Sequence, residues 1–381
     1  MARLDEISDL QMGKTPSRNN ADYWTDGQYD WVSIADLGSY QKYVEDTKER
    51  ISALAVQESG IKSVPANTVI MSFKLSLGKT AITQEPVYTN EAIMAFIPTG
   101  KYAVLPDYFY YLFSAKDWTK GTNRAVMGTT LNKATLGAVS ITVPPIDEQR
   151  KIAAILDKVS DLIAKRRQQL DTLDELAKAR FVEMFGDPMG NPMGWEKIAL
   201  GKRCDIVTGN TPSRADPENY GNFIEWIKSD NINTPAVLLT EAQENLSETG
   251  FHKCRFVEAG SLLMTCIAGS INCIGNVAVT NRRVAFNQQI NAIVPKQDDV
   301  LYLYWLMLLS KPAIHSTINM ALKGILSKGQ LSEMAFPFPP LELQNQFSVL
   351  VKKIEKTKAS INLSLEKLKT LKKALIQEYF G

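Results

Sequence analysis

The chain has 381 residues, of which 45% are hydrophobic, so it is long enough for more than one domain and can bury substantial cores. Its longest apolar run, residues 300–309, is about half of what a bilayer crossing needs. The first ten residues carry acids where a signal peptide needs an apolar stretch, so a cytoplasmic location is expected. A net charge of +2 lacks the overall basic character of many nucleic-acid-binding proteins, so any phosphate-binding surface must come from local clusters.

The cysteines and histidines argue against a metal site. All four cysteines, Cys204, Cys254, Cys266 and Cys273, lie in the second half, and no two form a Cys-x-x-Cys pair. Reduced, mostly buried thiols are therefore expected. With two histidines in the chain, a zinc site would need His252 and Cys254 plus distant partners. We expect neither a metal nor a cofactor on this chain.

The first predicted element is a mixed α+β domain over residues 1–145. It contains the loop Gly13-Lys-Thr-Pro-Ser-Arg18, and short β-branched runs such as residues 68–71 alternate with Gly, Pro and Asn turns. A helix is predicted over residues 107–118. Its aromatic side chains, such as Tyr108, are expected in the core rather than stacked on bases.

The second predicted element, residues 146–188, is a long spacer helix. It follows the pair Pro144-Pro145, carries Asp147 and Glu148 in a first turn whose dipole favours acids, and ends before Gly186. Apolar residues recur in alternating steps of four and three, as in a coiled coil. The predicted seam comprises Ile152, Leu156, Val159, Ile163, Arg166, Leu170, Leu173, Ala177, Arg180 and Met184.

The rest of the chain repeats both elements, which is the most informative feature of the sequence. Gly209-Asn-Thr-Pro-Ser-Arg214 repeats the first loop, and Phe338-Pro-Pro-Leu341 repeats the proline pair. A second domain is therefore predicted over residues 189–340, with a helix over 300–310, and a second spacer helix over residues 341–381. Its seam comprises Phe347, Val351, Ile354, Lys358, Ile361, Leu365, Leu368, Lys372, Leu375 and Tyr379.

Two such helices in one chain most simply pair with each other. The predicted fold is α+β, with two tandem domains, two long helices in an antiparallel coiled coil, and a pseudo-two-fold repeat. At about 1.5 Å per residue, each helix is long enough to act as a ruler. The alternative is that the helices merely hold the two domains together.

The order of these parts resembles the specificity subunits of Type I restriction-modification systems. The resemblance rests on the two Gly-x-Thr-Pro-Ser-Arg loops and on the segment Pro-Pro-Ile-Asp-Glu-Gln-Arg-Lys-Ile-Ala-Ala-Ile-Leu at residues 144–156, with a fainter echo at residues 339–351, and it covers the entire chain. It implies two target-recognition domains, each reading one half of a bipartite DNA site, and helices that set the spacer. Such a subunit is not itself an enzyme.

The implied partners are double-stranded DNA, two modification (methyltransferase) subunits docked on the helices, and restriction subunits. S-adenosylmethionine, ATP and magnesium would be bound by those partner subunits.

A reader of DNA needs phosphate contacts for affinity and base-edge contacts for specificity, and loops rich in Lys, Arg, Ser, Thr and Asn suit both. The candidates lie in the two repeated loops and in the segments before the proline pairs: Lys14, Thr15, Ser17, Arg18, Arg124, Thr129, Thr130, Lys133, Asn210, Thr211, Ser213, Arg214, Lys323, Ser327 and Lys328. The alternative is that Thr-Pro-Ser-Arg forms a turn whose hydroxyls bond their own backbone. Four further basic residues have no counterpart in the other copy: Lys74, Lys79, Arg282 and Arg283. This difference fits two domains that read different DNA sequences, and it fits solvated surface charge equally.

Two other functional classes stay open. A methyltransferase with a degenerate motif is the enzyme alternative, but neither the amide nor the aromatic residue of an Asn-Pro-Pro-Tyr loop flanks the proline pairs. No glycine-rich phosphate loop or nucleophile motif is present either. The structural alternative is a coiled-coil adaptor that binds protein alone.

Overall fold

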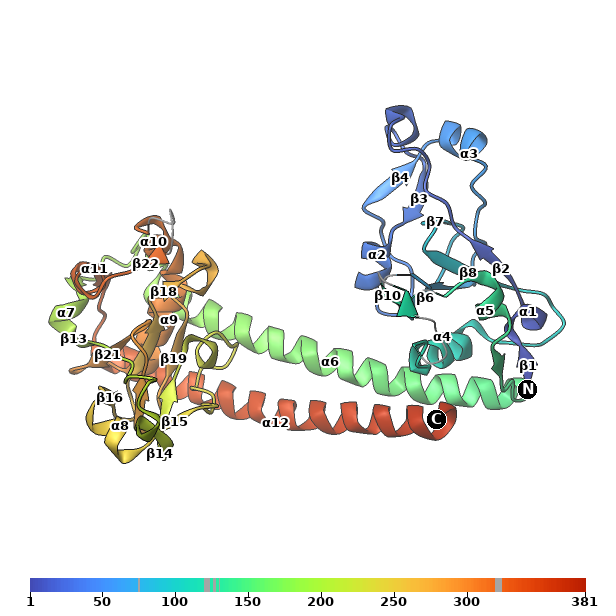
Figure 1. The fold of residues 1–381 in the computed structure, drawn as a ribbon. Coiled ribbons are helices and arrows are strands. Elements are labelled where there is room, and N and C mark those ends of the chain that lie inside the picture. Colours follow the sequence, from blue (N-terminus) through green and yellow to red (C-terminus); the bar gives the residue numbers. More distant parts are fainter. Residues whose placement is uncertain (75, 120–123, 126–127, 130, 319–323) are drawn as a thin grey trace. The chain divides into compact units, whose positions relative to one another are not determined.

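The computed structural model describes residues 1–74, 76–119, 124–125, 128–129, 131–318 and 324–381 (Figure 1). The chain divides into two compact units, residues 1–165 with 364–381, and residues 166–363. This division crosses both long helices, α6 (Ile146–Phe185) and α12 (Leu341–Phe380). Each unit therefore consists of one α+β domain packed on one part of α6 and one part of α12. Among the described residues, no helix is both long and apolar enough to span a membrane.

The centre of the first unit is a four-stranded antiparallel sheet with the order β2-β8-β5-β6. These strands are Ser8–Met12, Ile93–Pro98, Val69–Ser72 and Thr80–Ile82. A smaller sheet has the order β4-β3-β7 (Glu49–Ile51, Tyr29–Val32 and Tyr88–Thr89). Two-residue strands pair β1 (Ala2–Arg3) with β11 (Ser140–Ile141), and β9 (Arg124–Ala125) with β10 (Gly128–Thr129).

The four-stranded sheet is the middle of three layers, as alternate residues of β8 show. Met94 and Phe96 face one core with helix α4 (Pro106–Ala115), whereas Ile93 and Ala95 face a second core under the smaller sheet. Because both faces are covered, every residue of β5 is buried. The short helices of this unit are α1 (Leu4–Ile7), α2 (Ile34–Ser39), α3 (Ala53–Ser59), α5 (Lys133–Gly137) and the 3-10 turn η1 (Ala21–Tyr23).

Helix α4 confirms the predicted core role of its aromatic residues but is shorter than the predicted 107–118. Tyr108 and Tyr111 are each 2% exposed. The helix ends at Ala115 because Lys116 adopts an extended conformation. The chain then turns back, and the Trp118 indole donates to the Phe113 carbonyl at 2.8 Å.

The second unit repeats this architecture, which confirms the predicted pseudo-two-fold repeat. Its central sheet has the equivalent order β13-β21-β17-β19 (Cys204–Thr208, Ile290–Pro295, Leu262–Thr265 and Val277–Val279). Helix α9 (Val300–Leu309) takes the place of α4, and its Trp305 is buried in the core. The second sheet is β15-β14-β20-β16 (Asn245–Leu246, Tyr220–Ile227, Val284–Phe286 and Phe256–Val257).

The remaining elements of this unit are short. The strands are β12 (Lys197–Ala199), β23 (Ala335–Pro337), β18 (Ile267–Ala268) and β22 (Gly324–Ile325). The helices are α7 (Leu200–Arg203), α8 (Glu248–His252), α10 (Lys311–Ser316) and α11 (Lys328–Glu333), with 3-10 turns η2 (Pro217–Asn219), η3 (Ser229–Asn231) and η4 (Ile271–Cys273).

The long helices pack against each other in both units, and they run antiparallel. In the first unit, Ile152 and Leu156 near the start of α6 share a core with Leu375 and Tyr379 near the end of α12. In the second unit, the end of α6 lies beside the start of α12: Leu173, Ala177, Phe181 and Phe185 share a core with Phe347, Val351 and Ile354. The predicted antiparallel pair is therefore present.

The buried face departs from the predicted seam near the end of α6. Arg180 is exposed, whereas Phe181 and Phe185 are 1% and 2% exposed. The Phe181 ring stacks on Tyr302 of α9 with centroids 5.6 Å apart. Because α6 packs here on the domain as well as on α12, its buried stripe is wider than a coiled-coil seam. Along the rest of the pair, Val159, Ile163 and Leu365 are buried, and Leu170, Ile361 and Leu368 are half-buried.

Candidate nucleic-acid interface

Each Gly-x-Thr-Pro-Ser-Arg loop leaves the end of an outer strand of the central sheet, where two backbones approach closely. A Cβ atom at Gly13 would overlap the carbonyl oxygens of Thr89 and Asn90, and one at Gly209 would overlap those of Phe286 and Asn287. The backbone N–H groups that follow donate to the same segments, from Lys14 to Thr89 at 2.8 Å and from Asn210 to Phe286 at 3.1 Å. Glycine is required at these positions because a side chain would separate the strands.

A tryptophan from the second sheet of each unit, on β3 or β14, fixes each loop from the other side. The Trp31 indole donates to the Lys14 carbonyl at 3.1 Å, and the Trp226 indole donates to the Asn210 carbonyl at 3.3 Å. The tryptophan that follows each motif in the sequence is thus a support for the loop, and its edge is already used by a backbone acceptor.

The motif arginines form equivalent clusters, which we call the arginine clusters. The first consists of Arg18, Trp24, Trp31 and Glu49, and the second of Arg214, Tyr220, Trp226 and Glu244. Each guanidinium makes two hydrogen bonds to its glutamate; those of Arg214 measure 2.6 and 3.0 Å. Each also lies over aromatic rings, with Arg18 at 3.7 Å from the Trp24 centroid and Arg214 at 4.9 Å from that of Tyr220. The planar guanidinium suits both contacts.

The arginines also shift the titration of their partners. The hydrogen bonds from Arg214, joined by Lys228, lower the pKa of Glu244 to about 2, and Arg18 lowers the pKa of Glu49 in the same way. Both glutamates are therefore ionised at neutral pH. The two arginines remain accessible, with side chains 49% and 58% exposed. Exposed ion pairs of this kind are weak, so a phosphate or a guanine edge could compete for the guanidinium.

The other polar residues of the loops also have partners within the chain. The hydroxyl of Thr15 bonds to Glu91 and accepts from the Asn90 amide at 3.0 Å, and the hydroxyl of Thr211 bonds to Gln288. These bonds run to side chains, so the threonines do not form the self-contained turn considered above. Ser213 does fit that turn, since its hydroxyl accepts from the backbone of Ala215 at 3.2 Å.

The segments before the proline pairs place their candidates at the starts of short helices. Lys133 and Lys328 are the exposed first residues of α5 and α11. Ser327 caps α11 by accepting from the Gln330 backbone at 3.2 Å, which leaves its side chain at the surface. Arg124 and Thr129 belong to the paired strands β9 and β10, and Thr130 and Lys323 lie outside the described residues.

The two arginines without counterparts in the first domain differ from each other. Arg282 makes two bonds of 2.5 and 2.7 Å to Glu225 and donates to the Thr240 carbonyl at 3.0 Å, so it is part of the scaffold. Arg283 pairs with Glu258 at 2.7 Å, and both of these side chains are more than half exposed.

A polar hollow beside the second arginine cluster is a feature that sequence reasoning missed. Its volume is about 160 Å³, and its lining is Trp226, Lys228, Asp230, Asn231, Thr240, Glu241, Gln243 and Glu244. Its lining comes from the end of β14, from η3 and from the loop before β15, so no single sequence motif marks it. The one indication in the sequence was a basic residue, Lys228, two positions after Trp226.

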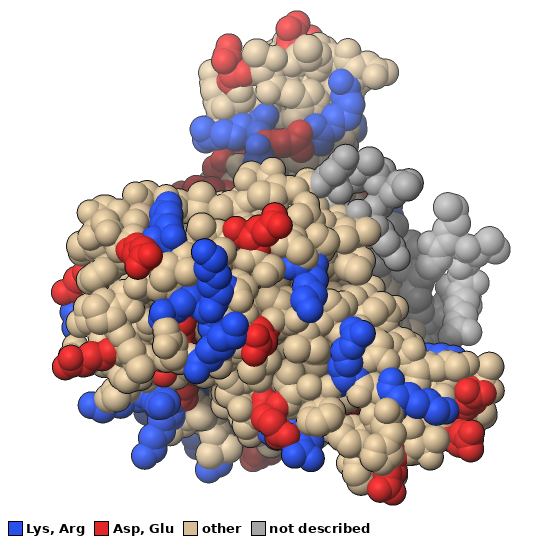
Figure 2. Space-filling model, turned by 90° about the vertical axis from the view of Figure 1, so that its left-hand side faces the viewer, with Lys and Arg blue, Asp and Glu red and all other residues tan. Residues whose placement is uncertain are grey.

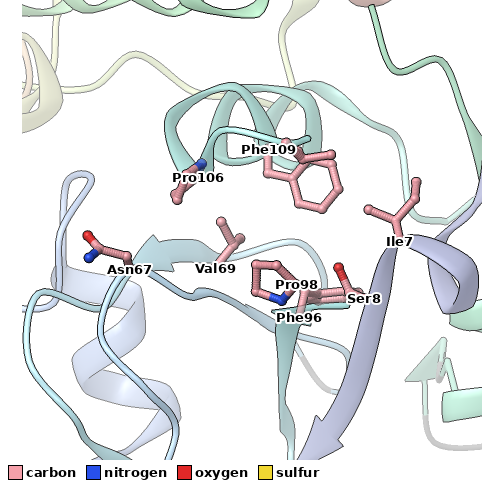
Figure 3. A pocket seen from close by; sticks show the side chains of 9 residues that line it. Ile7, Ser8, Asn67, Val69, Phe96, Pro98, Pro106 and Phe109 are labelled. Carbon is pink, nitrogen blue, oxygen red and sulfur yellow. The ribbon is translucent and has the colours of Figure 1, made fainter. Parts of the chain in front are cut away.

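The first unit has a small apolar recess between helix α4 and the central sheet (Figure 3). Pro106 and Phe109 of α4 lie over Val69, Phe96 and Pro98 of the sheet, and the volume is about 10 Å³. That is room for about one water molecule, so the recess suits packing and not a ligand.

The surface charge is mixed rather than uniformly basic. The face of the second unit at the front of Figure 2 shows Lys and Arg side chains interspersed with Asp and Glu. Any DNA contact on this face would therefore rest on individual basic side chains rather than on a broad positive patch. Among the described residues, no group of three or more His, Cys, Asp or Glu side chains is arranged to hold a metal ion. Cys204 and Cys266 are buried, and Cys254 and Cys273 are partly exposed.

Comparison with known proteins places this architecture in context. A family model described as the Type I restriction modification DNA specificity domain matches residues 1–174 and 192–370. The chain is 30% identical over 232 residues to the Type I restriction enzyme MjaIX specificity subunit of Methanocaldococcus jannaschii, covering 56% of this chain and 53% of that protein. It is 29% identical over 187 residues to the EcoR124I/EcoR124II specificity subunit of Escherichia coli, covering 47% and 45%. The matches span about half the length of these relatives.

Solved structures share the fold. The S subunit of a Type I restriction-modification system from M. genitalium superposes with a TM-score of 0.61 at 13% identity, over 100% of this chain and 95% of that chain. A chain from a structural study of complex assembly in the type I R-M system gives 0.60 at 18% identity, over 100% and 96%. At these identities the likeness establishes the fold alone.

Proposed function

Because the chain belongs to the Type I restriction modification DNA specificity domain family, we propose that it is the sequence-specific DNA-binding subunit of a Type I restriction-modification complex. Each α+β domain reads one half of a bipartite DNA site. The two long helices set the spacer between the half-sites and dock two modification subunits. The observation that carries this proposal is the presence, twice in one chain, of the same domain with the same arginine cluster on the same kind of loop.

Two copies of one scaffold with different surface chemistry suit the reading of two different half-sites. Both clusters pair an arginine with a glutamate, but the second adds Lys228, which also binds Glu244. The residue after the motif glycine is Lys14 in one copy and Asn210 in the other. The Lys14 ammonium donates to the Ser59 carbonyl, and a lysine of this kind suits phosphate or guanine. The Asn210 amide group donates to the Lys253 carbonyl and accepts from the Arg255 backbone, both at 2.8 Å, so it supports its own loop instead. Divergence at matched positions is what distinct half-sites require.

The proposed DNA contacts are the candidates in the repeated loops and before the proline pairs. Arg18 and Arg214 are the strongest because their side chains are exposed, pre-oriented on aromatic rings and held by an ion pair that DNA could replace. Lys133 and Lys328 are exposed helix-start residues that suit phosphate contacts. Thr15 and Thr211 would act mainly by holding the loop.

The outer faces of the long helices are the proposed docking surfaces. Each helix has 40 residues and is therefore about 60 Å long. Apolar side chains lie outside the buried stripe, including Leu176 and Val182 on α6 and Val349 and Leu363 on α12, all 40 to 60% exposed. Exposed leucine and valine along a helix suit a protein partner.

The chain itself would perform no chemistry. Each proline pair begins a long helix, with Val143 or Phe338 before it where an adenine methyltransferase has the catalytic amide. The modification subunits would supply S-adenosylmethionine and adenine methylation, and the restriction subunits would supply ATP and magnesium. Restriction requires both kinds of partner.

The test is to map methylated adenines in the host genome with and without this gene, with the modification subunits present in both strains. We expect a bipartite motif, two specific halves around an unspecific spacer, that disappears with the gene. Persistence of the motif without the gene would refute the proposal. Methylation by the purified chain alone would favour the methyltransferase alternative, and stable assembly without any DNA binding would favour the adaptor.

A further inference from the structure

One glutamine in the second turn of each long helix occupies the same buried position in both copies. Gln149 of α6 and Gln344 of α12 are each 0% exposed. The Gln149 amide donates to the carbonyls of Ala103 at 2.9 Å and Pro144 at 2.8 Å, and its oxygen accepts from the backbone of Leu105 at 2.9 Å. One side chain thus binds two separate segments of the domain's chain.

Gln344 makes the matching set of bonds. Its amide donates to the Pro339 carbonyl and to an Asp298 carboxylate oxygen, both at 2.9 Å, and its oxygen accepts from the backbone of Asp299 at 2.9 Å. The only change of kind is that a carboxylate replaces a carbonyl. In both copies the amide nitrogen donates one bond to the proline pair and one to the segment before α4 or α9. The amide oxygen accepts one bond from the backbone of that same segment.

These bonds join the long helix to the layer that covers the sheet. Residues 103–105 lead directly into α4, and residues 298–299 lead directly into α9. A tyrosine in each of these helices adds a second tie: Tyr108 donates to the Thr142 carbonyl at 3.2 Å, and Tyr302 donates to the Pro337 carbonyl at 2.6 Å. Apolar packing is non-directional, whereas hydrogen bonds with buried partners select one angle.

Each copy adds its own ion pair to this joint. In the second unit, Arg203 makes bonds of 2.8 and 2.5 Å to Asp298, whose carboxylate is fully buried. In the first unit, Lys42 pairs with Asp107 of α4 at 2.7 Å and also with Asp157 of α6. Different residues therefore reinforce the contact between domain and long helix in the two units. This recurrence indicates that the angle between the domain and its helix matters for function.

We propose that Gln149 and Gln344 are positioning residues that hold each recognition domain at a fixed angle on its long helix. This angle determines which separation of the two half-sites the protein accepts. The inference rests on the proposed reading of a bipartite site. Binding at one half-site needs only the loops of one domain, whereas simultaneous binding at two half-sites needs both domains to be correctly oriented.

The test replaces each glutamine with methionine in the full chain, co-purified with its modification subunits. Methionine is unbranched, similar in length and favourable in helices, and it removes all three hydrogen bonds. The matched control is Gln346→Met, because Gln346 is exposed on the same turn of α12. Binding is measured on duplexes that carry both half-sites with the spacer varied by one base pair at a time, and on duplexes that carry one half-site.

We expect Gln149→Met and Gln344→Met to leave half-site sequence preference and single half-site affinity unchanged. The preference for the correct spacer over its neighbours should fall by about tenfold, since rigid linkage accounts for much of the gain from two-site binding. Gln346→Met should keep the wild-type spacer preference. Hydrogen exchange at the amides of Leu105 and Asp299 should become faster only in the variant of the corresponding unit.

An unchanged spacer preference in both glutamine variants, with faster exchange at the freed amides, would overturn the positioning role. Equal losses on single half-sites and bipartite sites would also overturn it and assign the glutamines to general stability. If a methionine variant does not assemble, Gln149→Asn is measured instead, since it keeps the amide but is one methylene shorter. An unchanged spacer preference, or equal losses on single and bipartite sites, would overturn the proposal for this variant too. Failure of the wild-type chain to bind a bipartite site would instead refute the proposed function.

Discussion

The Nζ atom of Lys358 lies 2.7 Å from Oδ1 of Asp174, so a salt bridge joins α12 to α6 across 184 positions of sequence. The lysine is 8% exposed and also contacts Glu355 at 3.1 Å. Burial lowers the pKa of Lys358, but the two carboxylates outweigh that effect and raise it, so the lysine stays charged. A charged residue that is buried at a seam position and paired across the two helices favours one register over others.

A double-mutant cycle with Asp174→Asn and Lys358→Met measures this pair. We expect a coupling free energy of about 1 kcal/mol in urea unfolding, less than for a fully buried pair because the Asp174 side chain is 49% exposed. The matched control is the Glu366–Lys369 pair within α12, at the same 2.7 Å but at the surface. Its coupling should be no more than about 0.5 kcal/mol. Equal couplings would mean that the Lys358 pair does not specify the helix register.

The apolar seam gives a second prediction. Leu365→Glu places a charge where the side chain is 6% exposed, and should cost about 3–5 kcal/mol of unfolding free energy and abolish assembly with the modification subunits. Leu363→Glu makes the same chemical change two residues earlier, where the leucine is 60% exposed, and should change stability by less than about 0.5 kcal/mol. Thermal unfolding compares the stability of the two variants, and gel filtration with the modification subunits checks the assembly of the Leu365→Glu protein. Normal assembly of the Leu365→Glu protein would show that the helices do not depend on this contact.

The repeat and the long helices could be predicted because they are local or periodic signals. The two proline pairs and the recurring apolar steps specify α6 and α12 without knowledge of the rest of the chain. The burial of Phe181 and Phe185 could not be predicted, because it depends on contact with α9, which the sequence does not place. The same holds for the glutamates that bind Arg18 and Arg214, since they lie about 30 residues further along the chain, Glu49 at the start of β4 and Glu244 directly before β15. For Gln149 and Gln344, recurrence in both copies was the available signal, but their partners follow from the tertiary fold alone.

The arginine clusters predict separate reading by the two domains. Arg214→Ala should weaken or relax recognition of one half-site, by about ten- to hundredfold if the guanidinium reads a base, and leave the other half-site unchanged. Arg18→Ala should do the reverse. Arg283→Ala is the control in the same domain, because its ion pair with Glu258 lies outside the repeated loop. Binding to duplexes with each half-site permuted gives the result, and equal loss at both halves would indicate a general phosphate contact.

The low pKa of Glu244 predicts a pH dependence of stability. Its pKa is lowered from 4.5 to about 2 in the folded chain, so ionised Glu244 stabilises the fold above pH 4.5, and this contribution is lost as the pH falls toward 2. Glu244→Gln has no such titration. The stability difference between wild type and variant should therefore shrink between pH 4.5 and 2, measured by thermal unfolding. A difference that stays constant over this range would contradict the assigned ion pair.

The last prediction concerns the helices as a ruler. Four residues inserted into α6 after Gln169, and four into α12 after Asn362 at the level set by the Asp174–Lys358 contact, lengthen both helices together and nearly preserve the seam. Four residues add about 6 Å and about 40° of net rotation. DNA advances about 3.4 Å per base pair and turns once in about 10.5 base pairs, so the rotation matches one base pair and the length is closer to two. We therefore expect methylation mapping to show the same two half-sites with a spacer longer by one or two base pairs. An active insertion protein that methylates at the original spacer would rule out the ruler and leave the helices as a passive link.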